Sequence, residues 1–450
     1  MSFFELATDR VIATERFSVE WAAAASGASS LVSRDKGPLE ACRPERQPGG
    51  KAGERRSSCC QPLVLRFGPM TTDLVQDSWT RIDAWLREHA PRTFATLRPP
   101  AGGEEIAAAQ QELGVTFPPD LVASLLRHNG ALEGPEAFRF STGDRLLGVS
   151  GILGDTGFMR GIDQGLDGET EGYWLHDYVK FGSYDVTSDG LLMDCRTGRD
   201  SFGVIGRFFD ETGTSFGQAD SLGEYLAELA GTLERGQDAG VVTFNGRLFW
   251  EARPPARPQY SADEPLPAPD EQLPELDLSY SPTDLLHVSH LDGHEELGAL
   301  IAVLPYEQVV DAARKQLRRL AVETGLNNYP EVKTALDAWE CGVALPQPDQ
   351  TGPLALRLRA VLAQADTGRD HTRRWAAEKI ALGIWGSPYR AVCESAETRS
   401  HFTLDWRADL HADLGNQPLP PIPDDRFWGA LRNPAIDSSW YAAQYSQDQD

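Results

Sequence analysis

Residues 97–130 carry a helix–corner–helix pattern, which constrains the fold of this chain more than any other segment. The apolar residues of the first helix recur at three- and four-residue steps and so share one face: Ile106, Ala109 and Leu113. Gly114 is typical of a helix end, and Pro119 suits the first turn of the next helix, where its missing N–H costs little. No residue of the segment suggests catalysis, so it favours a binding protein.

The second helix of this pattern is expected to bury Leu121, Leu125 and Leu126, with Asn129-Gly130 as its left-handed stop. A further amphipathic helix over about residues 73–89 precedes the pattern. Its apolar residues also recur at three- and four-residue steps: Val75, Trp79, Ile82, Trp85 and Leu86.

After residue 137 the pattern changes, because glycines separate short apolar runs that predict antiparallel strands and hairpins. These runs cover residues 146–149, 173–181, 191–195 and 203–209. The stretch from Asp155 to Gly172 is expected to be a long acidic loop. Ser221 and Glu224 have the spacing of a capping box, which predicts a helix that ends at Gly236. Asn245-Gly246, between residues 241–244 and 247–250, predicts a hairpin.

The order of helices, strands, helix and hairpin predicts an α+β fold, with helices packed on one antiparallel sheet. Together with Val179-Lys-Phe-Gly182, Leu192-Met-Asp194 and Thr197-Gly198, the helix–corner–helix pattern resembles the SMI1/KNR4 (SUKH) superfamily over about residues 73–235. The resemblance implies the same α+β architecture and a non-catalytic, protein-binding domain. It further implies a bacterial immunity protein that sequesters a toxin domain, such as a nuclease, by stoichiometric occlusion. A regulatory scaffold, as in fungal cell-wall control, is the alternative within the same superfamily.

Composition divides the chain into five segments. They are residues 1–69, a disordered or non-native extension; 70–251, the SUKH-like domain; 252–283, an acidic proline-rich linker; 284–415, a separate all-helical domain; and 416–450, a tail. Helices are predicted in the fourth segment over residues 306–323, 331–341, 354–365 and 371–384. Met70 directly precedes the first amphipathic helix, which suggests that it is the native start; a real but disordered extension is the alternative.

The net charge of −25 bears on the partners of this protein. Residues 1–69 hold 10 basic and 8 acidic residues, whereas the other 381 hold 32 basic and 59 acidic ones. Such an acidic surface repels phosphate backbones and anionic lipids, so neither nucleic acid nor a membrane is expected as a partner. It suits a basic protein partner, such as a toxin domain, although acidic surfaces also serve solubility alone. The six scattered cysteines form no Cys-x-x-Cys pair, which indicates reduced thiols and a cytoplasmic location.

The candidate partner-binding segment is residues 173–178. On a strand, alternate side chains share a face, so Trp174, His176 and Tyr178 would form an aromatic and imidazole row. The alternative is that Trp174 and Tyr178 fill the core. Acidic residues nearby would steer a basic partner. The full candidate set is Trp174, His176, Asp177, Tyr178, Tyr184, Asp185 and Asp189.

A second kind of site is suggested by His287, His290 and His294, whose spacing places three imidazoles on one helix face, as a zinc site requires. Gly293 interrupts the segment, and no glutamate lies where a zinc protease needs its base. Exposed histidines at the start of a domain are the simpler interpretation. A metal-dependent enzyme that uses the helical domain is therefore kept as an alternative function, while no cofactor and no catalytic residue are expected.

Overall fold

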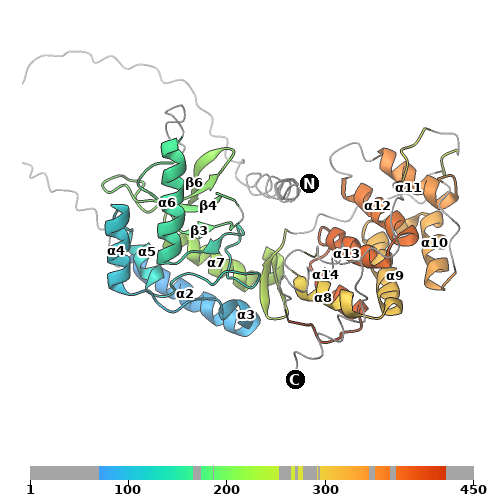
Figure 1. Ribbon diagram of the computed structural model, residues 1–450, viewed down its shortest axis with the longest axis horizontal. Coiled ribbons are helices and arrows are strands. Elements are labelled where there is room, and N and C mark those ends of the chain that lie inside the picture. The colour runs from blue at the N-terminus through green and yellow to red at the C-terminus, as the bar shows by residue number, and fades with distance from the viewer. Residues whose placement is uncertain are drawn as a thin grey trace, which may run out of the picture. The chain divides into compact units, whose positions relative to one another are not determined.

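The computed structural model has the α+β fold that the sequence predicts (Figure 1). It describes residues 70–165, 174–185, 187–252, 265–268, 272–276, 291, 294–343, 350–364 and 371–421. The predicted extension, residues 1–69, lies outside this part. Within the described residues, no helix combines the length and the apolar character that a bilayer crossing requires.

The first described elements are the helices that the sequence predicts. They are α2 (Met70–His89), a short α3 (Pro91–Phe94), α4 (Gly103–Leu113) and α5 (Pro119–Leu125). Gly114 ends α4 with a φ of 66°, as predicted, and Pro119 is the first residue of α5. The predicted end of α5 was wrong, because the helix stops at Leu125 and the Leu126 side chain is 46% exposed.

Gly130 has a role other than ending α5. Its φ is 80°, and a Cβ at this position would lie 2.2 Å from the backbone nitrogen of Gly148. Two chain segments therefore pass each other here at a distance that only glycine allows. The Asn129 side chain adds a hydrogen bond at the same crossing, because its Oδ1 accepts from the Val149 N–H at 2.8 Å.

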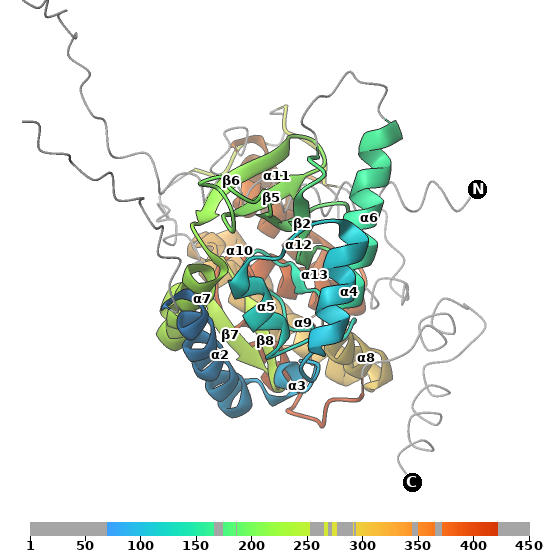
Figure 2. The ribbon, with the colours of Figure 1, turned by 90° about the vertical axis from the view of Figure 1, so that its left-hand side faces the viewer.

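This region contains a four-stranded antiparallel sheet with the strand order β2-β4-β5-β6. Figure 2 labels β2, β5 and β6 of this sheet. Its strands are β2 (Tyr178–Lys180), β4 (Gly190–Asp194), β5 (Ile205–Phe209) and β6 (Gly213–Ala219). One face of the sheet shares a core with α2, α4, α5 and α7 (Leu222–Arg235). The predicted N-cap of α7 is confirmed, because the Ser221 hydroxyl accepts from the Glu224 N–H at 3.2 Å.

The opposite face of the sheet is covered by α6 (Val149–Gly165). The predicted strand at 146–149 is confirmed only in part, because Leu146 belongs to a strand but Val149 begins this helix. The loop expected from Asp155 is helical as far as Gly165. The expectation fails because tertiary packing outweighs local propensity. Ile152, Thr156 and Met159 are fully buried, and Met159 shares a small core with Tyr178, Leu192 and Phe208 of the sheet. Lys180 also links the two elements, since its Nζ lies 3.2 Å from the Asp155 carboxylate.

Three exposed glycines of α6 are expected to tolerate alanine with a gain in stability. A Cβ at Gly154, Gly157 or Gly161 would meet no atom within 4 Å, so each position has room for alanine. We expect each Gly→Ala substitution to raise the free energy of unfolding by about 0.5–1 kcal/mol, because alanine loses less backbone entropy in a helix. Urea denaturation would measure the gain. Gly151→Ala is the control, because its Cβ would lie 3.0 Å from Leu147 Cδ2; equal gains at all four positions would contradict the argument.

Two short pairs of strands complete this region. β1 (Arg145–Leu146) pairs with β3 (Gly182–Ser183). The predicted hairpin around Asn245-Gly246 is confirmed as β7 (Val241–Phe244) and β8 (Arg247–Trp250). Asn245 and Gly246 have φ values of 49° and 72°, so both central residues are left-handed, as a two-residue type I′ turn requires.

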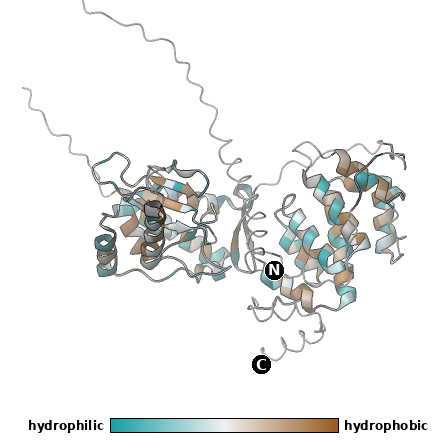
Figure 3. Ribbon diagram, turned by 45° about the horizontal axis from the view of Figure 1, so that its top comes forward, coloured by the Kyte–Doolittle hydropathy of each residue, from teal (hydrophilic) through white to brown (hydrophobic). Residues whose placement is uncertain are grey.

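The remaining described helices form a second hydrophobic core. They are α8 (Glu295–Val303), α9 (Tyr306–Glu323), α10 (Pro330–Glu340), α11 (Pro353–Gln364), α12 (His371–Trp385), α13 (Pro388–Arg399) and α14 (Trp406–Asp413). The four helices predicted here are confirmed, and α9 has the predicted bounds. Hydrophobic and hydrophilic residues alternate along these ribbons, as in amphipathic helices (Figure 3). The boundaries between the predicted domains stay predictions, since both cores belong to one compact unit, Pro69–Asp450.

Part of the predicted linker packs against these helices. Arg359 donates hydrogen bonds to the carbonyl oxygens of Leu273 and Pro274, each at 2.8 Å, and Leu276 is 4% exposed. Residues 272–276 are therefore held against the helical core.

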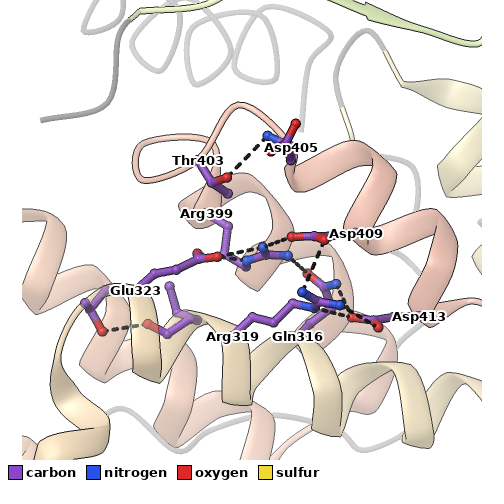
Figure 4. Close-up of polar contacts among 10 residues, drawn as sticks. Gln316, Arg319, Glu323, Arg399, Thr403, Asp405, Asp409 and Asp413 are labelled. Atoms are coloured by element: carbon purple, nitrogen blue, oxygen red, sulfur yellow. Dashed lines mark hydrogen bonds and ion pairs between the residues drawn. The ribbon is translucent and has the colours of Figure 1, made fainter. Parts of the chain in front are cut away.

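A network of charged groups lies inside the helical core (Figure 4). Arg399 of α13 has no exposed surface and pairs with both oxygens of Glu323 on α9, at 2.7 and 2.9 Å. It also pairs with Asp409 of α14 and donates to the Gln316 side chain at 3.0 Å. Arg319 pairs with Asp409 and Asp413. The network thus joins α9, α13 and α14 through hydrogen-bonded ions.

Candidate functional site

The predicted aromatic and imidazole row does not form. Strand β2 begins at Tyr178, so the alternation that would align Trp174, His176 and Tyr178 is absent. Trp174 and Tyr178 are 1% and 6% exposed, whereas His176 is exposed. The core alternative describes Trp174 and Tyr178 correctly, because the Trp174 ring packs edge-on against Tyr178 and Phe208, at 5.9 and 5.7 Å.

Two of the three acidic residues predicted to steer a partner are engaged within the chain. Asp185 pairs with Arg139 at 2.6 Å and with Arg145 at 2.9 Å, so two guanidinium groups neutralise its charge. Asp189 is 9% exposed and accepts a hydrogen bond from the Asp210 N–H at 2.9 Å. Asp177 is more accessible and lies 3.3 Å from the His176 ring. The side chains of His176 and Asp177 are more exposed, at 66% and 45%, than that of Asp185, at 25%.

Tyr184 is half-buried and has a structural contact. Its ring lies close to Gly143, where a Cβ would be 3.0 Å from Tyr184 Cε2. The role of the predicted set in binding a partner stays a prediction, but the structure places most of these side chains in packing or ion pairs.

Two aromatic side chains that the sequence analysis did not single out are exposed. Phe158 on α6 is 61% exposed and Phe216 on β6 is 39% exposed. Exposed aromatic residues are enriched in protein interfaces, where they bury much area at low entropic cost. Phe216 has a defined position, because its ring contacts the Tyr178 ring edge-on at 5.3 Å.

The aromatic rings form a continuous path from the core to the surface. Trp174 contacts Tyr178, and Tyr178 contacts Phe216. Arg196 lies over the Tyr178 ring at 5.5 Å and is held by Asp194, which pairs with it at 2.6 Å. Phe216 is thus an exposed aromatic residue whose ring is held by its contact with the buried Tyr178 ring. It is the residue of this region best placed to contact another molecule.

The histidine trio is only partly described. His287 and His290 lie outside the described residues, and His294 is 6% exposed, between the rings of Phe249 and Trp406. Arg407 Nε donates to His294 Nε2 at 3.1 Å, so this nitrogen's lone pair is already used. Burial, together with Arg407 and Arg247, lowers the pKa of His294 well below its usual value. The environment of His294 therefore fits neither of the two interpretations, a metal ligand or an exposed histidine.

Among the described residues, no group of three or more His, Cys, Asp or Glu side chains could hold a metal ion. The two buried cysteines are also poor nucleophiles. Burial raises the pKa of Cys195 and of Cys393, which disfavours the reactive thiolate.

Comparison with known proteins identifies the sheet-containing region. The sequence model of the SMI1 / KNR4 family (SUKH-1) matches residues 100–228, so the chain contains a domain of this family. The match runs from just before α4 into α7 and includes the whole four-stranded sheet. It confirms the resemblance that the helix–corner–helix pattern suggests.

Two yeast proteins show local similarity to the chain. A KNR4/SMI1 homolog of Eremothecium gossypii is 42% identical over 53 residues, which cover 12% of this chain and 8% of the relative. A KNR4/SMI1 homolog of Kluyveromyces lactis is 30% identical over 95 residues, which cover 20% of this chain and 17% of the relative. The similarity therefore spans less than a fifth of either relative's length.

Proposed function

We propose that this protein is a non-catalytic, protein-binding regulator, in which the SMI1/KNR4 domain recognises a basic protein partner in the cytoplasm. The observation that carries the proposal is Phe216, an exposed aromatic residue on β6 within the family match. The excess of acidic residues over the last 381 positions supports a basic partner, which such a surface would attract and orient.

The comparisons favour the regulatory type over the immunity type. Both relatives come from yeasts and carry the KNR4/SMI1 name, which fits the regulatory scaffolds of the superfamily better than a bacterial toxin inhibitor. Sequestration of a toxin domain is the second candidate, supported by the same acidic charge. A metal-dependent enzyme was suggested by the three histidines. His294 does not support it, because its Nε2 already accepts a hydrogen bond from Arg407.

Affinity purification with the full-length chain as bait, at low and high salt, tests this function. We expect a stoichiometric, basic protein that is released as salt rises, because salt screens attraction between exposed charges. Mass spectrometry would identify it. Cell-wall or signalling proteins would support the regulatory type, whereas a toxin domain would support the immunity type.

Two bait variants make this experiment specific. Phe216→Ala is expected to reduce the recovered partner at least about tenfold, the usual cost of removing an interface aromatic anchor. Phe158→Ala is the matched control, since it removes an equally large exposed ring from another element. If no stoichiometric partner is recovered at either salt concentration, the proposed function is refuted.

A further inference from the structure

Two arginine side chains of the sheet-containing region share one buried carboxylate. Arg127, which follows α5, places its Nε and Nη2 at 3.2 and 2.6 Å from Asp83 Oδ2. Arg87, one turn further along α2, places its Nη2 at 3.6 Å from the same oxygen. The other oxygen of Asp83 lies 2.9 Å from His128 Nε2. The two guanidinium groups therefore lie beside each other around a single negative charge.

This arrangement leaves one positive charge without a counterion. Neither Arg87 nor Arg127 has a second ion pair among the residues that the structure describes. Arg81, on the same helix, differs because both oxygens of Glu234 accept from it, at 2.8 and 2.6 Å. In a chain with a net charge of −25, a local excess of positive charge indicates a site for an anionic group.

Arg87 is held in a position that suits such a group. Its side chain is 54% exposed, and its guanidinium carbon lies 4.4 Å from the centre of the Phe94 ring. Among the described residues, the guanidinium group of Arg87 makes no hydrogen bond, so its N–H groups can serve an external acceptor. A planar guanidinium group that is stacked on an aromatic ring still presents two parallel N–H groups at its edge, which match a carboxylate.

The surroundings indicate what else the ligand carries. Helices α2, α3 and α5 lie side by side here (Figure 2). Leu126, directly before Arg127, is 46% exposed and gives the charged pair an apolar neighbour. The single excess charge is matched by a carboxylate, whereas a phosphate monoester carries more negative charge than the site would neutralise. An acidic side chain next to an apolar one therefore fits this surface.

We propose that Arg87 and Arg127 bind the carboxylate of an aspartate or glutamate of the partner protein, and that Leu126 contacts an apolar side chain beside it. This inference rests on the proposed protein-binding function and adds one acidic contact to a partner that is basic overall. The contact would fix how the partner is oriented, because a basic side chain brought against the two arginines would be repelled.

Selection from a random library of displayed peptides against the full-length chain tests the inference. We expect two groups of peptides. Basic peptides would bind the acidic surface in general, and a second group would carry aspartate or glutamate next to an apolar residue. The second group is diagnostic, because a chain of this net charge repels acidic peptides elsewhere. Fluorescence anisotropy with synthetic copies would give their affinities.

Point variants locate the binding of the acidic peptides. Arg87→Ala should weaken it at least about tenfold, the usual loss when a charged hydrogen-bonding partner is removed. Arg81→Ala is the matched control, because it removes the same charge from the same helix, and it should leave the affinity within about twofold. Both side chains are exposed, so both variants should keep the thermal midpoint of the wild type within a few degrees.

A charge exchange tests the contact directly. Arg87→Glu should reject the acidic peptide and prefer a copy whose acidic residue is replaced by lysine, because the attraction then has the opposite sign. An Arg87→Glu variant that binds both copies as the wild type does would contradict the contact.

Three further results would overturn the inference. They are a library that yields no acidic peptide, acidic peptides whose affinity is the same for the wild type and Arg87→Ala, and a phosphoserine copy that binds more tightly than the original peptide. A protein partner that is lost from the Phe216→Ala bait but retained by the Arg87→Glu bait would refute this contact alone. The proposed protein-binding function would then still hold.

Discussion

Replacing Arg399 with methionine is expected to lower the free energy of unfolding by about 3–5 kcal/mol, the usual cost of removing one partner from a buried ion pair. The guanidinium group has no exposed surface and contacts Glu323, Asp409 and Gln316 (Figure 4). Methionine fills a similar volume but donates no hydrogen bond, so the Glu323 carboxylate would stay in the helical core without its partner. Urea denaturation followed by circular dichroism would measure the loss.

Two further variants test the cause of this loss. Arg374→Met breaks an exposed pair with Glu378 four residues away, which should cost about 0.5 kcal/mol or less. Adding Glu323→Met to Arg399→Met should recover part of the stability, because it removes the stranded charge. A double variant that is destabilised by the sum of both single changes would show that the two residues are not coupled.

Replacing Asp83 with alanine is expected to destabilise the protein by a similar amount, about 3–5 kcal/mol. Asp83 lies on α2 and is 1% exposed. One of its oxygens lies 2.9 Å from His128 Nε2, and the other accepts from Arg127 Nη2 at 2.6 Å. The substitution would remove the partner of His128 Nε2, on a ring that is 9% exposed and packed against Trp79. Thermal and urea denaturation would both show the loss.

The dependence on pH gives this prediction a second measurement. Burial alone would raise the pKa of Asp83, but hydrogen bonds from His128 and Arg127 outweigh it, so the folded-state pKa lies below the ordinary aspartate value of 3.8. A carboxyl group with a lowered pKa stabilises the folded state above pH 3.8 and loses this contribution as the pH falls below that value. The alanine variant should therefore lose less stability than the wild type in this acidic range. Asp77→Ala, an exposed change on the same helix, should match the wild type at every pH.

The helices with strong local signals could be predicted from the sequence. In α9, Val309, Ala313, Leu317 and Leu320 repeat at three- and four-residue steps, and all four are fully buried. The start of α7 at Ser221 and the turn at Asn245-Gly246 also follow from residue types whose local geometry is nearly fixed. In these segments the local preference and the tertiary packing agree.

Helix α6 and strand β6 were missed because their local signals are weak. Helix α6 contains five glycines, and its stability comes from burying Ile152 in the main core and Met159 against the sheet. Strand β6 lacks an apolar alternation because it is an exposed edge, so only its pairing with β5 defines it. Long-range contacts decide both cases, and these contacts are not visible in a short sequence window.

The candidate site could not be predicted for the same reason, because it also depends on long-range contacts. The composition of residues 173–178 fits an interface and a core equally well, and the structure places Trp174 and Tyr178 in the core. Phe216 went unnoticed because it is a single aromatic residue among small and polar ones. Its importance depends on its exposure and on its contact with the Tyr178 ring, and both arise from the fold.

The hairpin β7–β8 affects how the chain can be divided into fragments. Arg247 of β8 pairs with the buried Glu296 of α8 at 2.9 Å, and Glu251, directly after the hairpin, pairs with Arg407 of α14. A cut at the predicted boundary, after residue 251, would separate each of these ions from its counterion. Excised helical fragments would then retain Glu296 and Arg407 as orphaned charges, so this cut yields a less stable piece than the intact chain. The hairpin packs against both cores, with Phe244 against the helical core and Val241 in the other, so its position in the chain does not assign it to one of them alone.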